Sequence, residues 1–262
     1  DVADEATRDK AIFYLTTLRR LKLVDAEHLW MLHSIYLTTE DSVERKSVLD
    51  ELLLQNPKDP LADHLSEALR PQSERQRCSP EYVRTLFDQA SDTFDRELLD
   101  KLDYRVPRRI AECLEQTQPR GKCFKRALDL GCGTGLVGQA VHPWCNELIG
   151  VDLSPGMLEK AAEREIYDAL QQADMESFLS THLHSFEVIF AGDVLIYVGD
   201  ISALFAAISE RLTRNGQFIF SIELCDGPDF RLRPSGRFAH GYDYVVKALE
   251  KNGLRVNFEE KI

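Results

Sequence analysis

The sequence predicts an α/β protein with a doubly wound, Rossmann-like and mostly parallel sheet, preceded by an all-helical N-terminal extension. Two observations support this fold class. From Lys125 onward, short apolar strands alternate with helical segments, which is typical of a parallel sheet covered on both faces. Before residue 71, apolar residues recur at helical spacing and glycine is absent. We therefore expect a helical domain over residues 1–75 and an α/β domain over residues 80–262.

The extension reads as roughly four helices. Apolar residues recur three or four positions apart, first at Ile12, Leu15 and Leu18 and later at Leu29, Leu32, Ile35 and Tyr36. Residues 56–60, NPKDP, predict a turn before a last short helix. The phrase QNPKDPLADHLSEAL resembles the junction between two tetratricopeptide repeats, although no complete copies follow at the 34-residue period of such repeats.

Residues 71–80, PQSERQRCSP, are polar and contain two prolines, so they predict a linker. Two helices are expected next, up to about residue 116. Ser79 or a neighbour caps the first of them, whose apolar stripe includes Tyr82, Phe87 and Phe94.

The α/β part contains six predicted strands, of which the last is expected at LRVNFEEKI, residues 254–262. The other five come earlier. They lie in RALDLG, ELIGVDL, ALQQAD, EVIFAGDVL and GQFIFSIEL, with helices at GLVGQAV, PGMLEKAAERE and ISALFAAISERL. In such a sheet, ligands bind at the carboxyl ends of the strands. The functional residues are therefore expected just after each strand.

The glycine-rich stretch LDLGCGTGLVGQA fits two cofactor patterns. GTGLVG, read from Gly133, matches the G-x-G-x-x-G dinucleotide pattern, which would indicate a nicotinamide-dependent oxidoreductase. However, the turn off the strand falls at Gly131, and from there the pattern would require glycine where Leu136 stands. The G-x-G-x-G register from Gly131 needs no such shift, and it suits a ligand without phosphate that approaches the backbone closely.

Three acidic residues favour the second register. Asp152 ends the second strand, where a carboxylate can accept both ribose hydroxyls, although both cofactor types share this feature. Asp174 ends the third strand and can accept a hydrogen bond from an adenine amine. Asp129 would repel a pyrophosphate and is better suited to an ammonium group.

These motifs together resemble the class I S-adenosylmethionine-dependent methyltransferases over about residues 80–262. LDLGCGTG resembles the first motif of that superfamily, GVDLSPGML the second, QQAD the third, and AGDVLIYVGDISALF the segment after the fourth strand. LFDQASDTFDRELLDKLDYRVP and LRPSGRFAHGYDYV further resemble a group of predicted methyltransferases with tetratricopeptide-like N-terminal helices. The resemblance implies S-adenosylmethionine as cofactor and S-adenosylhomocysteine as product.

The resemblance also implies which residues bind the cofactor. Asp129, Gly131, Cys132 and Gly133 would surround the methionine end, and Asp152 would bind the ribose. Leu153 and Met157 would flank the adenine, and Asp174 with the Met175 amide would read its edge. Asp193 would face the sulfonium. Residues expected to form a lid over the cofactor are Tyr82, Phe87 and Tyr104.

Methyl transfer from a sulfonium requires mainly positioning, and a base is needed only for acceptors of high pKa. The candidates for such a base are Asp193, Tyr197 and His240, because loops after strands four and five flank the methyl group in this fold. In RLRPSGRFAH, Arg231, Arg233 and Arg237 with His240 form a basic island that would suit an acidic acceptor, for which Arg233, Arg237 and His240 are the expected ligands. A solvated loop whose arginines pair with surface acids is the alternative.

Composition limits the partners. A formal net charge of −12 argues against nucleic acid and anionic membranes, and no apolar run is long enough to span a bilayer. The six cysteines contain no C-x-x-C pair, so we expect reduced thiols, no metal and a cytoplasmic protein. We expect methyl transfer to a small-molecule or acyl-carrier-bound acceptor, most plausibly at oxygen. Besides the oxidoreductase, a non-catalytic cofactor-binding protein that binds a protein partner through its N-terminal helices stays open.

Overall fold

Residues 2–101, 103–119 and 121–262 are described by a computed structural model, in which the chain divides into two units. The first unit extends to Glu74 and includes residues 233–236, and the second contains 75–232 and 237–262. Within the described ranges, no helix is both long and apolar enough to cross a membrane.

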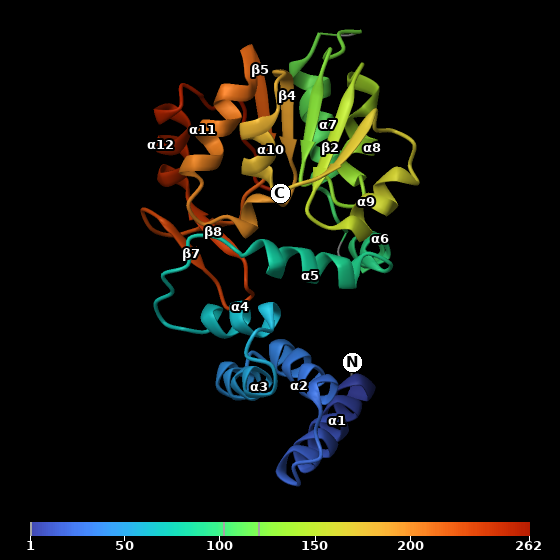
Figure 1. Cartoon of the computed structure of the whole chain (residues 1–262), viewed down its shortest axis with the longest axis vertical. Helices are drawn as coiled ribbons and strands as arrows, with labels where there is room; N and C mark the ends of the chain where they lie inside the picture. Colours follow the sequence, from blue (N-terminus) through green and yellow to red (C-terminus); the bar gives the residue numbers. More distant parts are fainter. Residues whose placement is uncertain (1, 102, 120) are drawn as a thin grey trace. The chain divides into compact units, whose positions relative to one another are not determined.

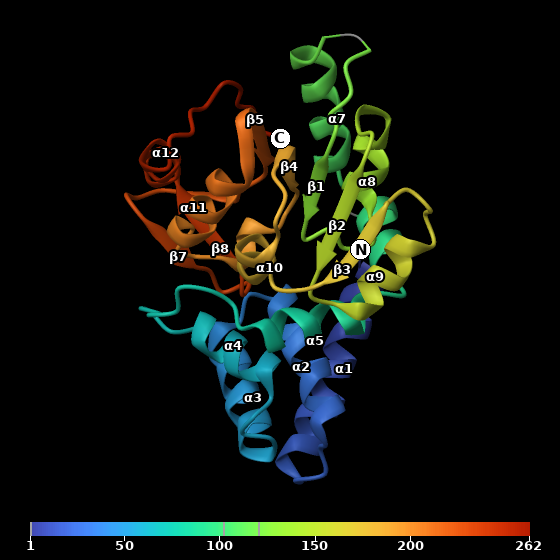
Figure 2. The same cartoon turned by 45° about the horizontal axis from the view of Figure 1, so that its top comes forward.

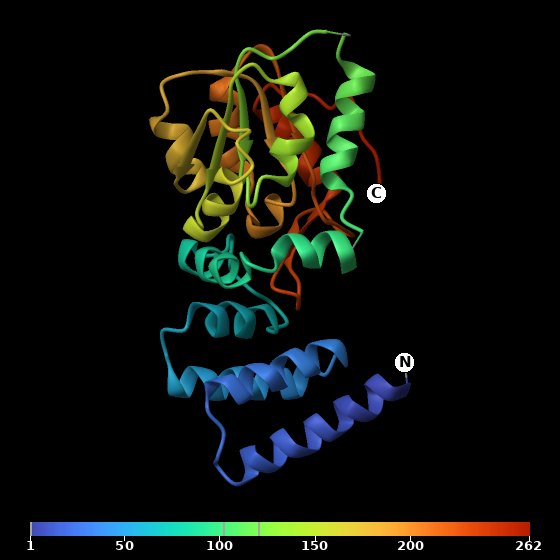
Figure 3. The same cartoon turned by 90° about the vertical axis from the view of Figure 1, so that its right-hand side faces the viewer.

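The first unit is helical, as predicted. Its described residues form the helices α1 (Val2–Arg20), α2 (Ala26–Thr38), α3 (Ser42–Gln55) and α4 (Pro60–Ala68). They are drawn in blue to cyan in Figure 3. Asp25, Asp41 and Asp59 each precede a helix and accept a hydrogen bond from an amide of its first turn. Leucines and valines at helical spacing form the core, including Leu29, Leu32, Val48, Leu49 and Leu52. The relation to tetratricopeptide repeats stays a prediction.

The second unit is built on a five-stranded parallel sheet in the order β3-β2-β1-β4-β5. Five strands lie in or next to the predicted segments: β1 (Ala127–Leu130), β2 (Leu148–Asp152), β3 (Ala169–Gln172), β4 (Phe186–Ala191) and β5 (Leu212–Phe220), the last of which begins before the predicted Gly216. The prediction of a sixth strand at residues 254–262 is wrong, because this segment is mostly exposed and pairs with no strand among the described residues. The chain starts in the middle of the sheet, moves to one edge and returns to β4, which confirms the doubly wound topology.

Helices cover both faces of this sheet (Figures 1 and 2). On one face, α7 (Val106–Thr117) and α8 (Leu136–Val141) pack on alternate residues of β1 and β4. On the other face lie α10 (Met175–Thr181), α11 (Ser202–Arg211) and α12 (Tyr242–Lys251). The remaining helix, α9 (Pro155–Ala162), contacts β2 and β3.

Two features surround the carboxyl ends of the strands. The first is α5 (Pro80–Ala90), capped by Ser79 as predicted, followed by α6 (Phe94–Arg96) and the π-helical turn η1 (Glu97–Lys101). Figure 2 shows α5 crossing this end of the sheet. The second is a small sheet that the sequence did not predict, formed by β6 (Leu224–Cys225), β8 (Phe238–Gly241) and β7 (Phe230–Leu232). Single turns η2 (His142–Trp144) and η3 (Leu195–Tyr197) complete the unit.

Gly138 in α8 allows a close contact that holds the first strand, its loop and α8 together. A Cβ atom at this position would lie 2.1 Å from the phenol oxygen of Tyr167. That phenol donates a hydrogen bond of 2.7 Å to Asp129 in β1. The glycine is therefore required by packing against Tyr167.

We expect Gly138→Ala to lower the free energy of unfolding by ~1–3 kcal/mol, because the added methyl group must displace the Tyr167 ring. Denaturant unfolding monitored by circular dichroism measures the change. In a Tyr167→Phe background the same substitution should cost less, since the nearest atom has been removed. An equal cost in both backgrounds would contradict this explanation.

Candidate active site at the carboxyl ends of the strands

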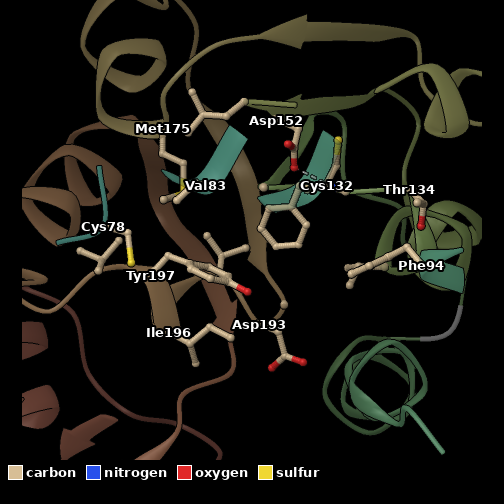
Figure 4. A pocket seen from close by; sticks show the side chains of 18 of the residues that line it. Cys78, Val83, Phe94, Cys132, Thr134, Asp152, Met175, Asp193, Ile196 and Tyr197 are labelled. Carbon is tan, nitrogen blue, oxygen red and sulfur yellow. Dashed lines mark hydrogen bonds between the residues drawn. The ribbon is translucent and has the colours of Figure 1, made fainter. Parts of the chain in front are cut away.

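A cavity of about 260 Å³ lies where the carboxyl ends of β1 to β4 meet the helix α5, and every residue lining it belongs to the second unit. Figure 4 shows Cys132 and Thr134, from the loop after β1, and Asp152, from the end of β2, around this cavity. Ile196 and Tyr197 enter from the segment after β4. The cavity occupies the position that the predicted topology assigned to a ligand.

The floor of the cavity is the glycine loop after β1. The strand ends at Leu130, and the chain turns at Gly131, so the register read from Gly131 is confirmed. Gly131 has a φ of 71° and lies so close to Val194 that a Cβ atom would be 2.5 Å from its side chain. Gly133 also has a positive φ, of 54°. The loop therefore presents backbone to the cavity where other residues would place a side chain.

Asp152 is the acidic residue at the centre of this loop system. Its two carboxylate oxygens accept hydrogen bonds from the amides of Ser154 and Gly133, at 2.8 and 2.9 Å. Burial raises the pKa of Asp152, and the backbone hydrogen bonds oppose that shift. Each oxygen keeps a lone pair for a ligand hydroxyl, since a carboxylate can accept about four hydrogen bonds.

The residues after β3 form the side of the cavity, together with Leu153. Asp174 caps α10 by accepting from the Ser177 amide, and its other oxygen forms an ion pair of 2.8 Å with Arg77. Arg77 comes from the predicted linker and also pairs with Glu176, at 3.2 Å. The carboxylate expected to read an adenine edge is therefore already engaged with a guanidinium.

The end of β4 holds Asp193 in an unusual conformation. Its φ of 53° is rare for a residue with a side chain, and such outliers concentrate at functional sites. The Ser221 hydroxyl accepts a hydrogen bond from the Asp193 amide at 2.8 Å and donates one to its carboxylate at 2.7 Å. Tyr104 also bonds this carboxylate, and burial of the phenol raises the pKa of Tyr104.

Tyr197 and Arg237 form a polar pair in a wall that is otherwise apolar. Arg237 donates a hydrogen bond to the phenol of Tyr197, and burial raises the pKa of that phenol to about 12 despite the positive charge. Tyr197 is therefore protonated at neutral pH, which disfavours it as a base. Phe87 packs edge-on against Tyr197 with ring centroids 5.3 Å apart.

Twelve residues predicted from the sequence line the cavity. They are Phe87, Tyr104, Gly131, Cys132, Gly133, Asp152, Leu153, Asp174, Met175, Asp193, Tyr197 and Arg237. Cys132 is 5% exposed, and burial raises its thiol pKa, so it contributes a small side chain and no thiolate.

The prediction that Asp129 contacts the cofactor needs correction. Its side chain is 1% exposed and lies beneath the glycine loop, where it bonds Tyr167 and does not line the cavity. The buried leucines on either side of it, Leu128 and Leu130, belong to the core on the opposite face of the sheet. Alternation along the strand therefore directs Asp129 to the face of α8.

His240 is likewise placed away from the cavity. It is fully buried in β8, stacks with Tyr244, and its Nε2 atom lies 2.8 Å from the Val198 carbonyl. Burial lowers its pKa, so it is neutral. The structure therefore supports neither the role of base nor that of acceptor ligand for His240.

Three other predicted residues lie outside the cavity lining. Tyr82 and Met157 are 3% and 0% exposed and pack inside the unit, and Arg233 belongs to the first unit. Tyr82 and Met157 lie on the apolar sides of α5 and α9. The spacing of apolar residues in a helix does not tell whether such a side chain packs in the core or contacts a ligand.

Sequence reasoning missed several residues of the site. Arg77, Thr134 and Ile196 line the cavity, as do the apolar lid residues Val83, Phe94 and Leu98. Ser221 does not line it but fixes Asp193. The apolar stripe of α5 was visible in the sequence, but nothing in it indicated that the stripe faces a cavity.

Comparison with known proteins agrees with this geometry. Residues 128–220 match the family described as "Methyltransferase domain". Over these residues the chain is similar to methyltransferase domains. The matched segment begins at β1 and ends with β5, so it contains the glycine loop, Asp152, Asp174 and Asp193.

Three curated methyltransferases resemble parts of this chain. Human methyltransferase-like protein 27 is 39% identical over 85 residues, which is 32% of this chain and 34% of that protein. The ubiquinone biosynthesis O-methyltransferase of Pasteurella multocida is 26% identical, over 51% of this chain and 64% of its own. Trans-aconitate 2-methyltransferase of Pseudomonas aeruginosa is 33% identical, over 56% of this chain and 48% of its own. The chain thus spans between a third and just under two thirds of these relatives.

Among solved structures, the magnesium protoporphyrin IX methyltransferase of Synechocystis PCC 6803 with bound SAH aligns with a TM-score of 0.55. The alignment covers 69% of this chain and 91% of the other, at 16% sequence identity. At this identity the likeness establishes the methyltransferase fold alone.

The buried Asp129 gives a testable pH dependence. Burial raises its pKa from an ordinary value near 3.8 to about 7, while the Tyr167 hydrogen bond opposes the shift. The folded state therefore keeps a proton that the unfolded state has lost between these pH values. The contribution of Asp129 to stability is full below pH 4 and decreases by at most ~1.4 kcal/mol per pH unit up to about pH 7.

We expect the Asp129→Asn variant, which cannot ionise, to gain stability relative to the wild type as the pH rises from 4 to 7, with no further change above. Urea unfolding at a series of pH values measures this difference. A difference between the two proteins that does not vary with pH would show that Asp129 ionises normally.

Proposed function

We propose that this protein transfers the methyl group of S-adenosylmethionine to a carboxylate oxygen of a small acidic acceptor. The observation that carries the proposal is the cavity itself, in which the glycine loop holds Asp152 at the carboxyl end of β2. The methyltransferase family match and the fold agree with this cofactor, and they do not favour the nicotinamide alternative.

The residues present fit S-adenosylmethionine. Asp152 accepts the ribose hydroxyls with the lone pairs left by Gly133 and Ser154. Leu153, Ala173 and Met175 provide apolar walls for adenine. The backbone at Gly131 and the carboxylate of Asp193 bound the region nearest β4, where negative charge suits a cation.

When bound, S-adenosylmethionine supplies a methyl group that a sulfonium has already activated. The chain therefore has to position the acceptor, exclude water and provide any base. Val83, Phe87, Phe94 and Leu98 cover the cavity with apolar surface, which excludes water. Arg237 holds an anionic group of the acceptor in a charge-assisted hydrogen bond.

The titratable side chains around the cavity favour an acceptor that can attack without losing a proton to a base. Tyr197 is protonated at neutral pH, and His240 lies outside the cavity. Asp193 already accepts hydrogen bonds from Ser221 and Tyr104. A carboxylate oxygen is ionised at neutral pH and can attack without proton removal. One relative is named for trans-aconitate, a tricarboxylic acid, which agrees with an acidic acceptor.

The acceptor class is tested by measuring S-adenosylhomocysteine formation with mono-, di- and tricarboxylic acids, matched phenols and an acyl carrier protein. We expect turnover with small carboxylic acids. Turnover only with phenols or only with the carrier would overturn the assignment, and product formation with any acceptor would exclude a purely non-catalytic protein.

The cofactor site is tested with Gly131→Asp and Asp152→Ala. Each should weaken S-adenosylmethionine binding roughly tenfold or more, about 1.4 kcal/mol, because one fills the floor and the other removes the ribose acceptor. Calorimetry measures the affinities for S-adenosylmethionine and, as a second ligand, for NAD. The control variant is Glu159→Ala, because this residue lies on the exposed side of α9. Unchanged affinity in both folded variants would show that the ligand binds elsewhere.

The acceptor anchor is tested with Arg237→Gln. We expect the KM for carboxylic acceptors to rise roughly tenfold or more, since a charged hydrogen bond is lost, while cofactor affinity stays within about twofold. Arg237→Lys should recover part of the loss, and Arg231→Gln, outside the cavity lining, should have no effect. An equal loss for uncharged acceptors would contradict a role in binding the anion.

A further inference from the structure

The segment that covers the cavity, residues 80–98, is named the lid here. It has two rows of side chains. Val83, Phe87, Phe94 and Leu98 line the cavity. The other row is acidic and consists of Asp88, Asp92 and Asp95, spaced four and three residues apart. Asp88 lies in α5, Asp92 in the turn that follows it and Asp95 in α6.

Each acid of this row contacts α9 or a residue adjoining it. Asp88 accepts from the Ser154 hydroxyl and, at 3.3 Å, from the Gly156 amide. Asp92 forms an ion pair of 3.2 Å with Lys160. Asp95 pairs with Arg164 just beyond the end of α9. The acids thus meet α9 in order, from its capping residue and first turn to the second residue after its end.

Two of these contacts reach the cofactor loops. Ser154, which Asp88 contacts, donates its amide to Asp152 and is fully buried. Asp95 also accepts from the hydroxyl of Thr134, which follows Gly133 and is 2% exposed. Arg164 additionally donates to the Thr134 carbonyl at 2.6 Å. The lid is therefore bonded to both loops that form the cofactor site.

We propose that Asp88, Asp92 and Asp95 form an electrostatic latch that holds the lid closed and sets the rate at which the cofactor and its product exchange. The three acids are positioning residues, since they act through Ser154, Thr134 and α9. The identity of the ligand rests on the proposed function, whereas the latch rests on the contacts of the lid.

The exposure of these groups explains why the latch can open. The side chains of Asp92 and Asp95 are 86% and 37% exposed, so water and salt weaken their ion pairs. The hydrogen bonds to the buried hydroxyls of Ser154 and Thr134 are directional and define one closed position. Release of a ligand beneath Phe87 and Phe94 requires these bonds to break together with the ion pairs.

The test compares the wild type with the double variant Asp92→Asn/Asp95→Asn. Stopped-flow measurement gives the dissociation rate of S-adenosylhomocysteine at low and high salt. Each exposed ion pair lost should speed release up to about fivefold at low salt, and the salt dependence of the wild type should diminish in the variant. Glu81→Gln removes a lid charge that has no contact with α9 among the described residues and serves as control.

A second measurement does not depend on the ligand. Hydrogen exchange of the lid amides in the cofactor-free protein should be faster in the double variant, with the exchange of β1 and β4 unchanged. The swap Asp92→Lys/Lys160→Asp re-forms this ion pair with the charges exchanged. Its lid exchange and its release of S-adenosylhomocysteine should therefore be about as slow as in the wild type. Lid exchange in the double variant that is as slow as in the wild type would overturn the latch. Lid exchange in the swap variant that is as fast as in the double variant would also overturn it. If the wild type binds no S-adenosylhomocysteine but its lid responds as described, the proposed function fails and the latch stands.

Discussion

The arrangement of the site depends on one partly buried carboxylate, Asp152. Removing a carboxylate from water is costly unless hydrogen bonds replace the lost hydration. Here the replacements are the amides of Gly133 and Ser154, which lie on two different loops. The loop after β1 and the first turn of α9 are therefore fixed relative to one another by the group that is proposed to bind the ribose. The lid contacts the same two loops through Thr134 and Ser154. The lid and the glycine loop are therefore held by the same two segments of the chain.

Those parts of the molecule that follow from local patterns could be predicted from the sequence. The five strands and the turn at Gly131 depend on short apolar runs and on a glycine that adopts a φ of 71°. Asp152, Asp174 and Asp193 line one cavity, as expected of residues at strand ends, because the topology of a parallel sheet brings these ends together. The small sheet of β6, β7 and β8 was missed, since its strands have only two to four residues and lack an extended pattern.

The direction of a side chain is what the sequence did not determine. Asp129 and Asp152 both lie in strands next to the cavity, yet one bonds Tyr167 beneath the glycine loop and the other lines the cavity. His240 resembled a loop residue, but it is fully buried in β8 and bonded to a carbonyl. Arg77 was missed because its partner, Asp174, is distant in sequence and the linker around it has no pattern. Such contacts arise from tertiary packing, which no local spacing reports.

The charges of the cavity explain how it can serve two ligands of opposite character. Asp152, Asp174 and Asp193 line one small space, and their mutual repulsion must be offset. Arg77 neutralises Asp174, and hydroxyl or amide donors stabilise the other two without adding positive charge. The region between Asp152 and Asp193 therefore stays negative, which suits a sulfonium cation. Arg237 and Tyr197 give the adjoining wall the opposite character, which suits an anion. The proposed acidic acceptor would thereby be drawn to the side of the cavity that faces the cation, and this opposition of charges would select both the proposed reactants and their orientation.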